Sequence, residues 1–261
     1  MNGPLSGSAA LCLHGFGSTP FEMRGLAGVL EAAGCVTSAP LLPGHGTSPE
    51  DWNRTGFDHW AGAAQREYDR LAGLAERVFV CGLSMGGLLA LHLGAVRRPA
   101  AIAALAAPVF LYRFYPLEMT DWRLPLLPLF RRVRPLWPTA PGGAESRRIA
   151  PWQGYEGVIA LGALAGLMDG MRRVRARLGE VTAPLLALHS PGDVTVPLSS
   201  SMAIVAGVSS AVRRLELLPV AERTTSRHLL TTHRDTRPRV ERLVPEFFAQ
   251  CLEPAAGPAD A

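Results

Sequence analysis

Residues 78–94 read VFVCGLSMGGLLALHLG, two apolar runs joined by the segment Gly82–Gly87, which holds three glycines and one serine. A continuous helix would not carry these glycines, and a surface loop would be more polar, so the segment predicts a very tight turn between a buried strand and a helix. In a Gly-x-Ser-x-Gly turn of this kind, the serine occupies a strained position and the small neighbours let strand and helix pass closely. The pattern predicts a nucleophile elbow with Ser84 as the nucleophile and the positive end of the next helix directed at it.

The rest of the chain alternates short apolar runs with stretches whose apolar spacing fits helices. This alternation predicts an α/β fold, with a mostly parallel sheet and helices on both faces. Right-handed crossovers would place the carboxyl ends of all strands at one edge, where ligands bind in such sheets. The candidate strands are Ala9–Leu13, Cys35–Ala39, Val78–Cys81, Ala101–Ala106, Leu185–His189 and Leu215–Leu218, and the early candidate helices are Glu22–Ala33, His59–Ala75 and Met85–Val96.

The alternation stops between Pro108 and about Val181. Seven prolines lie between positions 116 and 151, among many leucines and two tryptophans. Proline at this density excludes a long regular helix, whereas the apolar content is too high for a disordered linker. We therefore expect residues 109–181 to form a cap over the sheet edge, with residues 1–108 and 182–261 as the core.

Composition indicates a globular chain, since 48% of its 261 residues are hydrophobic and 18% are charged. No apolar run approaches the ~20 residues that a membrane span needs, and the N-terminus lacks the basic region of a secretory signal. The four cysteines lie outside any CxxC pattern and are expected to be free thiols, which favours a cytoplasmic location and no metal site. We expect the tail after Glu253 to be disordered.

All basic residues are arginines, and the formal net charge is +4. They cluster at 131–134, 147–148 and 172–175. These clusters favour solvated surfaces, with contact to an anionic lipid or another polyanion as the alternative. We expect no nucleic-acid partner, and the oligomeric state is not predicted.

A serine hydroxyl is a weak nucleophile, so Ser84 needs a base, and the base needs an orienting acid. The histidines after Ser84 are His92, His189, His228 and His233. His228 is favoured as the base because it lies in a polar loop after the last strand, and His233 is the alternative. His92 lies on the helix that leaves the elbow, and His189 ends a strand, so both are expected to be structural.

The acid is expected between the serine and the histidine in chain order. Asp193 fits, because it stands in a Pro-Gly-Asp turn directly after the strand Leu185–His189. A purely turn-forming role is the alternative for Asp193. Asp169 lies in the expected cap and Asp235 follows the histidine, so neither is favoured.

An oxyanion hole needs two backbone N–H groups aimed at one point. We expect one from Met85, which follows the nucleophile, and one from Phe16, in the loop after the first strand. Gly15 lets that loop turn, and Gly15, Gly17 and His45 are expected to lie against the substrate.

The same loop, GFGSTP at 15–20, also follows a strand and opens a helix, as a dinucleotide-binding fingerprint would. Pro20 replaces its third glycine, and the next strand ends in Ser38-Ala39-Pro40 without an acidic residue for a ribose. The chain also lacks the lysine of a phosphate-binding loop. We therefore expect no nucleotide and no other cofactor.

Together these residues resemble the α/β-hydrolase superfamily, and most closely its small bacterial carboxylesterases and monoacylglycerol lipases. The resemblance covers most of the chain. It implies an α/β-hydrolase fold with about six parallel strands, a cap between two core strands, Ser84, Asp193 and His228 as a triad, and Phe16 and Met85 as oxyanion donors. The motifs that carry it are LHGFGS at 13–18 with EMR at 22–24, LPGHG at 42–46, Trp52 through Trp60, the elbow, GD at 192–193 with VP at 196–197, and SRH at 226–228.

The chain departs from this family at the residue before the histidine, where glycine is usual and Arg227 stands. A charged side chain there could alter the loop or reach the mouth of the pocket. The cap is poorly matched, and substrate choice would be decided there.

The expected activity is that of a serine ester hydrolase that forms an acyl-enzyme on short- to medium-chain acyl esters or monoglycerides. Acyl transfer and thioester cleavage would use the same triad and are the alternatives. Arginines of the cap could instead bind a polar or anionic leaving group. A non-catalytic receptor is disfavoured by the intact triad, and epoxide or haloalkane hydrolysis by the serine at position 84.

Overall fold

The central sheet of the protein consists of six parallel strands in the order β10-β9-β4-β3-β1-β2. The computed structural model describes residues 3–252, so the tail for which we expect disorder lies outside the described residues. All six candidate strands are present, and the predicted α/β-hydrolase sheet is confirmed. Their bounds are β1 (Ser8–Leu13), β2 (Val36–Ser38), β3 (Arg77–Leu83), β4 (Ala101–Leu105), β9 (Leu185–His189) and β10 (Arg213–Leu217).

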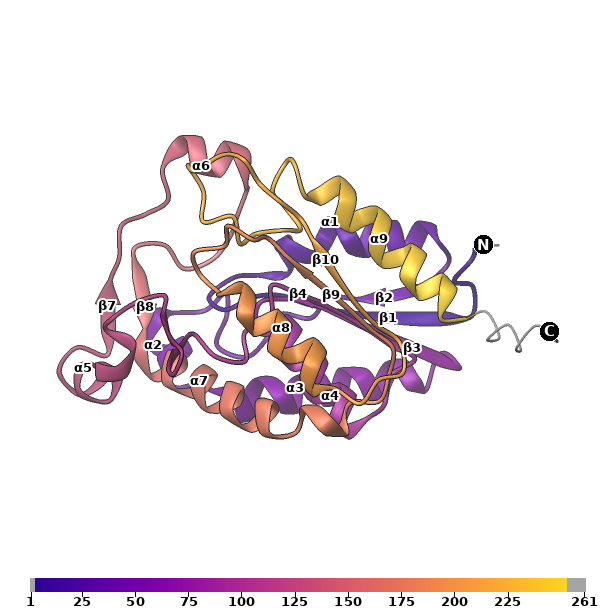
Figure 1. Cartoon of the computed structure of the whole chain (residues 1–261), viewed down its shortest axis with the longest axis horizontal. Coiled ribbons are helices and arrows are strands. Elements are labelled where there is room, and N and C mark those ends of the chain that lie inside the picture. The colour runs from indigo at the N-terminus through magenta and orange to yellow at the C-terminus, as the bar shows by residue number, and fades with distance from the viewer. Residues whose placement is uncertain (1–2, 253–261) are drawn as a thin grey trace.

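Helices cover both faces of the sheet (Figure 1). One face carries α1 (Arg24–Ala32) and α9 (Arg237–Gln250), and the other carries α3 (Phe57–Ala72), α4 (Met85–Val96) and α8 (Leu198–Gly207). The central strands are buried on both sides, which explains why they read as continuous apolar runs rather than alternating ones. The packing of helices on both faces forms two hydrophobic clusters, one between the sheet and each helical layer.

Two short helical segments stand close to the site described below. The turn η1 (Pro20–Met23) is a 3-10 helix that leads into α1, and α2 (Pro49–Asn53) begins with Ser48 as its cap. The predicted helix at 22–33 is therefore present, with its first turn wound more tightly than the rest.

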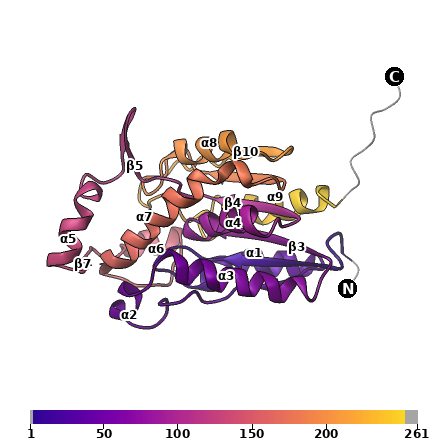
Figure 2. The ribbon, with the colours of Figure 1, turned by 90° about the horizontal axis from the view of Figure 1, so that it is seen from below.

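The segment between β4 and β9 forms the short elements that its prolines allow. Two antiparallel pairs stand apart from the main sheet, β5 (Tyr112–Phe114) with β6 (Leu117–Met119), and β7 (Leu136–Pro138) with β8 (Val158–Ala160). Figure 2 shows α5 and β5 extending beyond one end of the sheet. The helical elements of this segment are η2 (Leu124–Leu126), α5 (Leu127–Val133), α6 (Ala144–Ile149), α7 (Leu161–Ala176) and η3 (Leu178–Glu180).

Helix α7 joins this segment to the layer over the sheet, because it packs against α3 and α4 at one end and against α5 at the other. The division of the chain into a core and a cap at residues 109–181 therefore remains a prediction. Residues 3–252 include no helix long and apolar enough to cross a bilayer.

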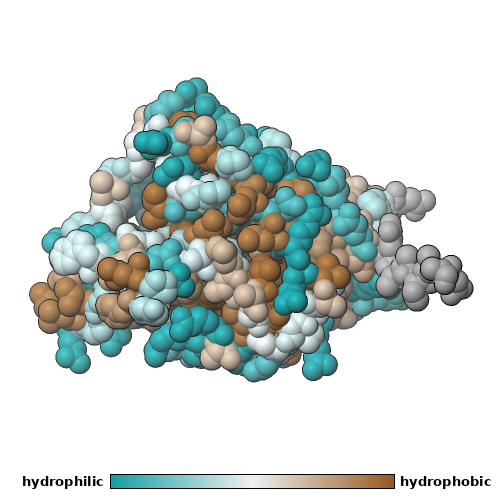
Figure 3. Space-filling model, in the orientation of Figure 1, coloured by the Kyte–Doolittle hydropathy of each residue, from teal (hydrophilic) through white to brown (hydrophobic). Residues whose placement is uncertain are grey.

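Large hydrophobic side chains are exposed mainly around the β5–β6 hairpin and α5. Tyr115 is 94% exposed, and Leu117, Trp122, Leu129 and Val133 are also exposed. Figure 3 shows hydrophobic residues at the end of the molecule where α5 lies. The arginines at 131 and 132 are exposed on α5, and Arg134 is exposed directly after it, as expected for a solvated cluster.

The cysteines agree with the expectation of free thiols. Cys12, Cys35 and Cys81 are buried, Cys251 is half-buried, and all four are free. The Sγ atoms of Cys12 and Cys81 lie 3.4 Å apart on neighbouring strands, without a disulfide between them.

Phe79 on β3 stacks on Phe248 of α9, with ring centroids 4.4 Å apart and both side chains fully buried. We expect Phe248→Ala to lower the free energy of unfolding by about 3–5 kcal/mol, because it leaves a cavity under α9. Glu246→Ala, on an exposed ion pair of the same helix, should change it by less than about 1 kcal/mol. Urea unfolding followed by circular dichroism measures both, and equal losses would contradict the packing described here.

Candidate active site

Ser84 stands alone between the last residue of β3 and the first residue of α4. Its backbone has φ 54° and ψ −117°, a left-handed conformation that is strained for a residue other than glycine. The Ser84 N–H donates to the carbonyl of Leu105 on the neighbouring strand, at 2.8 Å. Its Oγ has no hydrogen-bond partner within residues 3–252. The local fold thus presents a free hydroxyl at the apex of a tight turn.

The glycines around Ser84 are required by contact distance. A side chain at Gly82 would overlap the backbone of Gly86, and a side chain at Gly86 would overlap the carbonyl of Leu13, at the end of β1. A methyl group at Gly87 would lie 2.8 Å from the Cβ of Ala107. The elbow is therefore pressed against the end of β1, from which the next loop begins.

Asp193 and His228 are joined by a short hydrogen bond. The Nδ1–H of His228 donates to Oδ2 of Asp193 at 2.6 Å. Oδ1 of the same carboxylate accepts from the N–H groups of Thr195 at 2.7 Å and Val196 at 3.0 Å. Because Nδ1 carries the proton, Nε2 of His228 keeps its lone pair, as a general base requires.

The environment of His228 favours its charged form. Burial lowers the pKa of this imidazole, but the negative charges of Asp193 and then Glu22, together with the hydrogen bond to Asp193, raise it above its ordinary value of 6.5. The side chain of Asp193 is fully buried and His228 is 7% exposed, so water screens this attraction little.

The other histidines have structural partners. His92 bonds to Gln65 at 2.8 Å, and His189 bonds to Ser201 at 2.7 Å and to the Val196 carbonyl at 3.1 Å. His233 bonds to Glu222 at 3.1 Å. These contacts favour His228 as the base. Of the two disfavoured acids, Asp169 pairs with Arg172 and Asp235 with Arg234.

The loop before His228 holds an uncommon backbone conformation. Arg227 has φ 57°, the region that glycine adopts most easily. Its N–H donates to Thr225 Oγ1 at 3.0 Å, and the side chain lies so close to Gly192 that a methyl group there would be 2.7 Å from Nη1. Arg227 therefore keeps the backbone of the usual glycine while its guanidinium lies beside the turn that carries Asp193.

The loop after β1 offers one free N–H group between two that are occupied. The Gly15 N–H donates to Glu22 Oε2 at 2.8 Å, and the Gly17 N–H donates to His45 Nε2 at 3.1 Å. The Phe16 N–H between them has no partner within the described chain. The Met85 N–H is the first of α4 and, like the other N–H groups of a first helical turn, has no intrahelical acceptor.

Two buried histidines support this loop in their neutral form. Burial lowers the pKa of His14 to about 3 and that of His45 to about 4. His14 accepts from the Leu42 N–H at 3.0 Å, and His45 holds Gly17 as described. The sequence placed His45, Gly15 and Gly17 against the substrate. Their contacts here are with other residues of the protein, and a role in substrate binding remains a prediction.

Glu22 is a site residue that the sequence analysis did not assign. Its carboxyl is 2% exposed and bonds to Gly15 directly beside Phe16. Burial raises its pKa, and the hydrogen bond from Gly15, the nearby polar groups of Ser18 and Trp152 and the charge of His228 oppose that rise. The sequence feature that could have pointed to Glu22 is an acidic residue between apolar neighbours at the start of a helix, in Pro20-Phe21-Glu22-Met23.

Residues 152–155 of the expected cap dock on the same loop. The Tyr155 N–H donates to the Gly17 carbonyl at 2.9 Å, and Ser18 Oγ donates to the Gln153 carbonyl at 3.2 Å. The ring of Tyr155 stacks on Trp52, and Trp52 in turn contacts Phe16, with centroids 4.7 and 4.6 Å apart. The expected cap thus forms one wall of the site.

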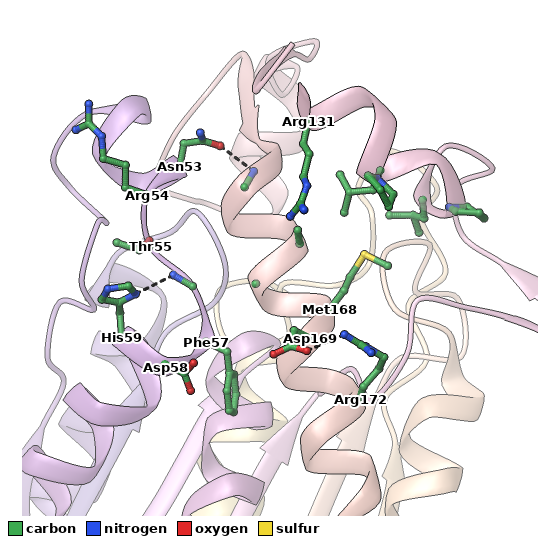
Figure 4. Close-up of a pocket in the computed structure, with 18 of the residues that line it drawn as sticks. Asn53, Arg54, Thr55, Phe57, Asp58, His59, Arg131, Met168, Asp169 and Arg172 are labelled. Carbon is green, nitrogen blue, oxygen red and sulfur yellow. Dashed lines mark hydrogen bonds and ion pairs between the residues drawn. The ribbon is translucent and has the colours of Figure 1, made fainter. Parts of the chain in front are cut away.

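A cleft of about 660 Å³ opens elsewhere, between residues 53–59 and helices α5 and α7 (Figure 4). Arg131 reaches into it from α5, opposite Asp169 and Arg172 on α7. Its lining includes none of Ser84, Asp193 and His228, so this cleft is separate from the reactive hydroxyl. Among residues 3–252, no three His, Cys, Asp or Glu side chains are grouped to hold a metal ion.

Comparisons with known proteins show the family and the fold. The family model described as "Serine aminopeptidase, S33" matches residues 8–222. A thermostable monoacylglycerol lipase from Bacillus sp. (strain H-257) is 30% identical over 263 residues, which cover 95% of this chain and 92% of the lipase. A carboxylesterase from Bacillus subtilis (strain 168) is 34% identical over 102 residues, or 39% of this chain and 42% of the esterase. A solved structure of the metagenome-derived lipolytic enzymes LipS and LipT superposes with a TM-score of 0.78 and 25% identity, over 95% of this chain and 96% of that chain.

The strained backbone of Arg227 can be tested with two substitutions that both remove the guanidinium. We expect Arg227→Gly to be more stable than Arg227→Ala by about 1 kcal/mol, because only glycine adopts this positive φ without a steric penalty. Urea unfolding of the two variants gives the difference. An alanine variant as stable as the glycine variant would mean that the loop does not hold this conformation.

Proposed function

The chain belongs to the serine aminopeptidase S33 family of α/β-hydrolases and is a serine ester hydrolase of the monoacylglycerol lipase and esterase type. We propose that it cleaves acyl esters with Ser84, His228 and Asp193 as its triad. The observation that carries this proposal is the 2.6 Å bond between His228 and Asp193. It leaves Nε2 of the histidine as a base at the sheet edge where Ser84 presents its hydroxyl.

The proposed reaction begins when Oγ of Ser84 attacks the ester carbonyl and its proton passes to Nε2 of His228. Asp193 fixes the tautomer of the imidazole and stabilises the imidazolium that forms. The Phe16 and Met85 N–H groups would hold the tetrahedral oxyanion, and the N-terminus of α4 adds its positive dipole. The C–O bond then breaks, and the alcohol leaves with the proton from His228.

Deacylation repeats these steps with water as the nucleophile. His228 takes a proton from the water, and the hydroxide oxygen bonds to the acyl carbon. The bond between the acyl carbon and Ser84 Oγ then breaks, and Ser84 Oγ takes the proton back from His228. The carboxylic acid is released. The chain's own groups supply every proton transfer in this scheme.

The substrate we propose is a short- to medium-chain acyl ester, with monoglycerides included. The expected cap brings Tyr155 beside the loop after β1, where its ring stacks on Trp52 and Trp52 contacts Phe16; this aromatic wall supports an apolar acyl site. The thermostable monoacylglycerol lipase, which matches 95% of this chain, supports a glycerol ester as the substrate.

The triad assignment predicts which substitutions abolish turnover. Ser84→Ala and His228→Ala should each lower kcat for p-nitrophenyl butyrate by about 10⁴-fold or more, because the triad acts as a unit. His233→Ala should keep most of the activity, since this side chain bonds to Glu222 instead. A serine-directed fluorophosphonate should label the unmodified protein and not Ser84→Ala. A fully active Ser84→Ala protein would reject the mechanism, and the reverse order of the two histidine variants would reassign the base.

The raised pKa of His228 predicts the pH dependence. The base must be neutral to accept the serine proton, and a raised pKa keeps it charged to a higher pH. The rate constant kcat/KM should therefore fall on acidification through an apparent pKa above 6.5, the ordinary value. The measurement is the pH profile of p-nitrophenyl butyrate hydrolysis, and an acid limb centred below 6.5 would contradict the environment described for His228.

The substrate class can be tested with a chain-length series of p-nitrophenyl esters and monoacylglycerols. We expect kcat/KM to be highest for short to medium acyl chains. An acyl-CoA, an acceptor alcohol and an amino-acid p-nitroanilide are the controls. Three outcomes would contradict ester hydrolysis. Faster turnover of the acyl-CoA would indicate a thioesterase, and acyl transfer to the alcohol in preference to water would indicate an acyltransferase. A preference for the anilide would indicate a peptidase.

A further inference from the structure

Glu22 is a buried carboxyl that the proposed reaction does not use. It lies in η1, just before α1, and only 2% of its surface is exposed. A buried carboxylate is costly unless hydrogen bonds compensate it, so its presence beside the reactive groups calls for a physical reason.

The contacts of Glu22 come from separate parts of the site. Its Oε2 accepts from the Gly15 N–H at 2.8 Å. Polar groups of Ser18, in the same loop, and of Trp152, in the expected cap, lie near enough to its carboxyl to favour the ionised form. A methyl group at Gly15 would lie 3.1 Å from Glu22 Oε2 and 3.6 Å from the carbonyl of Leu83, the residue before Ser84. Glu22 thus lies where the loop after β1, the cap segment and the elbow meet.

We infer that Glu22 is a positioning residue for the ester hydrolysis proposed above: its carboxylate orients the loop so that the Phe16 N–H faces the oxyanion, and its negative charge stabilises the imidazolium of His228. This inference rests on the proposed function. It adds a second carboxylate to the one that already bonds to the histidine.

The orienting role follows from the order of hydrogen bonds along the loop. Gly15 is held by Glu22 on one side of Phe16, and Gly17 is held by His45 on the other. With both neighbours fixed, the peptide that carries the Phe16 N–H has little freedom to rotate. An oxyanion donor needs this kind of preorganisation, because its benefit depends on not reorienting during the reaction.

The electrostatic role follows from the charges that face His228. Asp193 approaches it from the loop after β9, and Glu22 approaches from η1. His189 at the end of β9 also faces it and is neutral, because burial lowers the pKa of His189. Asp193 and Glu22 are therefore the carboxyl groups around the imidazole, and each in its ionised form favours the cation that forms when the imidazole takes the serine proton.

Glu22→Gln separates the charge from the shape, because glutamine can still accept from the Gly15 N–H. We expect kcat for p-nitrophenyl butyrate to fall about tenfold with KM little changed, and the acid limb of kcat/KM to move to lower pH, since loss of the negative charge lowers the pKa of His228. Glu22→Ala, which also releases Gly15, should lose about 100-fold, because a misplaced donor stabilises the oxyanion poorly. Glu31→Gln makes the same change at an exposed glutamate of α1 and should match the unmodified protein.

A second readout does not depend on activity. In a Ser84→Ala background, the titration of His228 followed by proton NMR of its Nδ1–H should move to lower pH when Glu22→Gln is added, and should not move with Glu31→Gln. An unchanged titration and an unchanged pH profile in Glu22→Gln would overturn the inference while leaving the triad intact. An active Ser84→Ala protein would instead overturn the proposed function. If Glu22→Ala does not fold, Glu22→Gln and the titration still decide.

Discussion

The site depends on one close contact between backbones, where the elbow after β3 meets the end of β1. There is no room for a side chain at Gly86 beside the carbonyl of Leu13. Because the loop with Phe16 begins at the next residue, His14, the contact that brings α4 to the sheet also brings the loop beside Ser84. The proposed nucleophile and the proposed oxyanion donors are therefore positioned by the same packing.

This packing must hold strained backbone in place. Ser84, Ala106 and Arg227 all have positive φ, although none is glycine, and each such residue costs of order 1–3 kcal/mol. The N–H groups of Ser84 and Ala106 donate to the next strand of the sheet, at Leu105 and Leu188. A sheet buried on both faces can hold these conformations, because its strands cannot shift without opening two hydrophobic clusters.

The sequence predicted the parts of the protein that depend on local pattern. The strands were readable as short apolar runs, and Ser84, Asp193 and His228 could be proposed from chain order and position after strands. The structure brings Asp193 and His228 into contact across 35 residues of chain. The elements of 109–181 were not predicted: up to Pro151 the prolines divide the segment into pieces too short to show a period, and α7, which lies beyond the last of these prolines, was missed.

Glu22 and Arg227 show a different limit of sequence reasoning. Glu22 accepts a hydrogen bond from Gly15, and Trp152, from far along the chain, lies near its carboxyl, so its role exists only once the fold is formed. Arg227 was visible as a departure from glycine, but the sequence could not show that its backbone keeps a positive φ. In both cases the role of one residue depends on contacts made in the folded protein, and the spacing of apolar residues along the sequence does not reveal such contacts.

The same contacts link the choice of substrate to the chemistry. The cap segment bonds to the loop after β1 through Tyr155 and Gln153, and Trp152 reaches the carboxyl of Glu22. A change in the cap that moves residues 152–155 would therefore act on the Phe16 N–H and on the charge facing His228. Under the proposed function, the cap segment bonds to the same loop that carries the proposed oxyanion donor, and this contact couples variation in the cap to the catalytic rate.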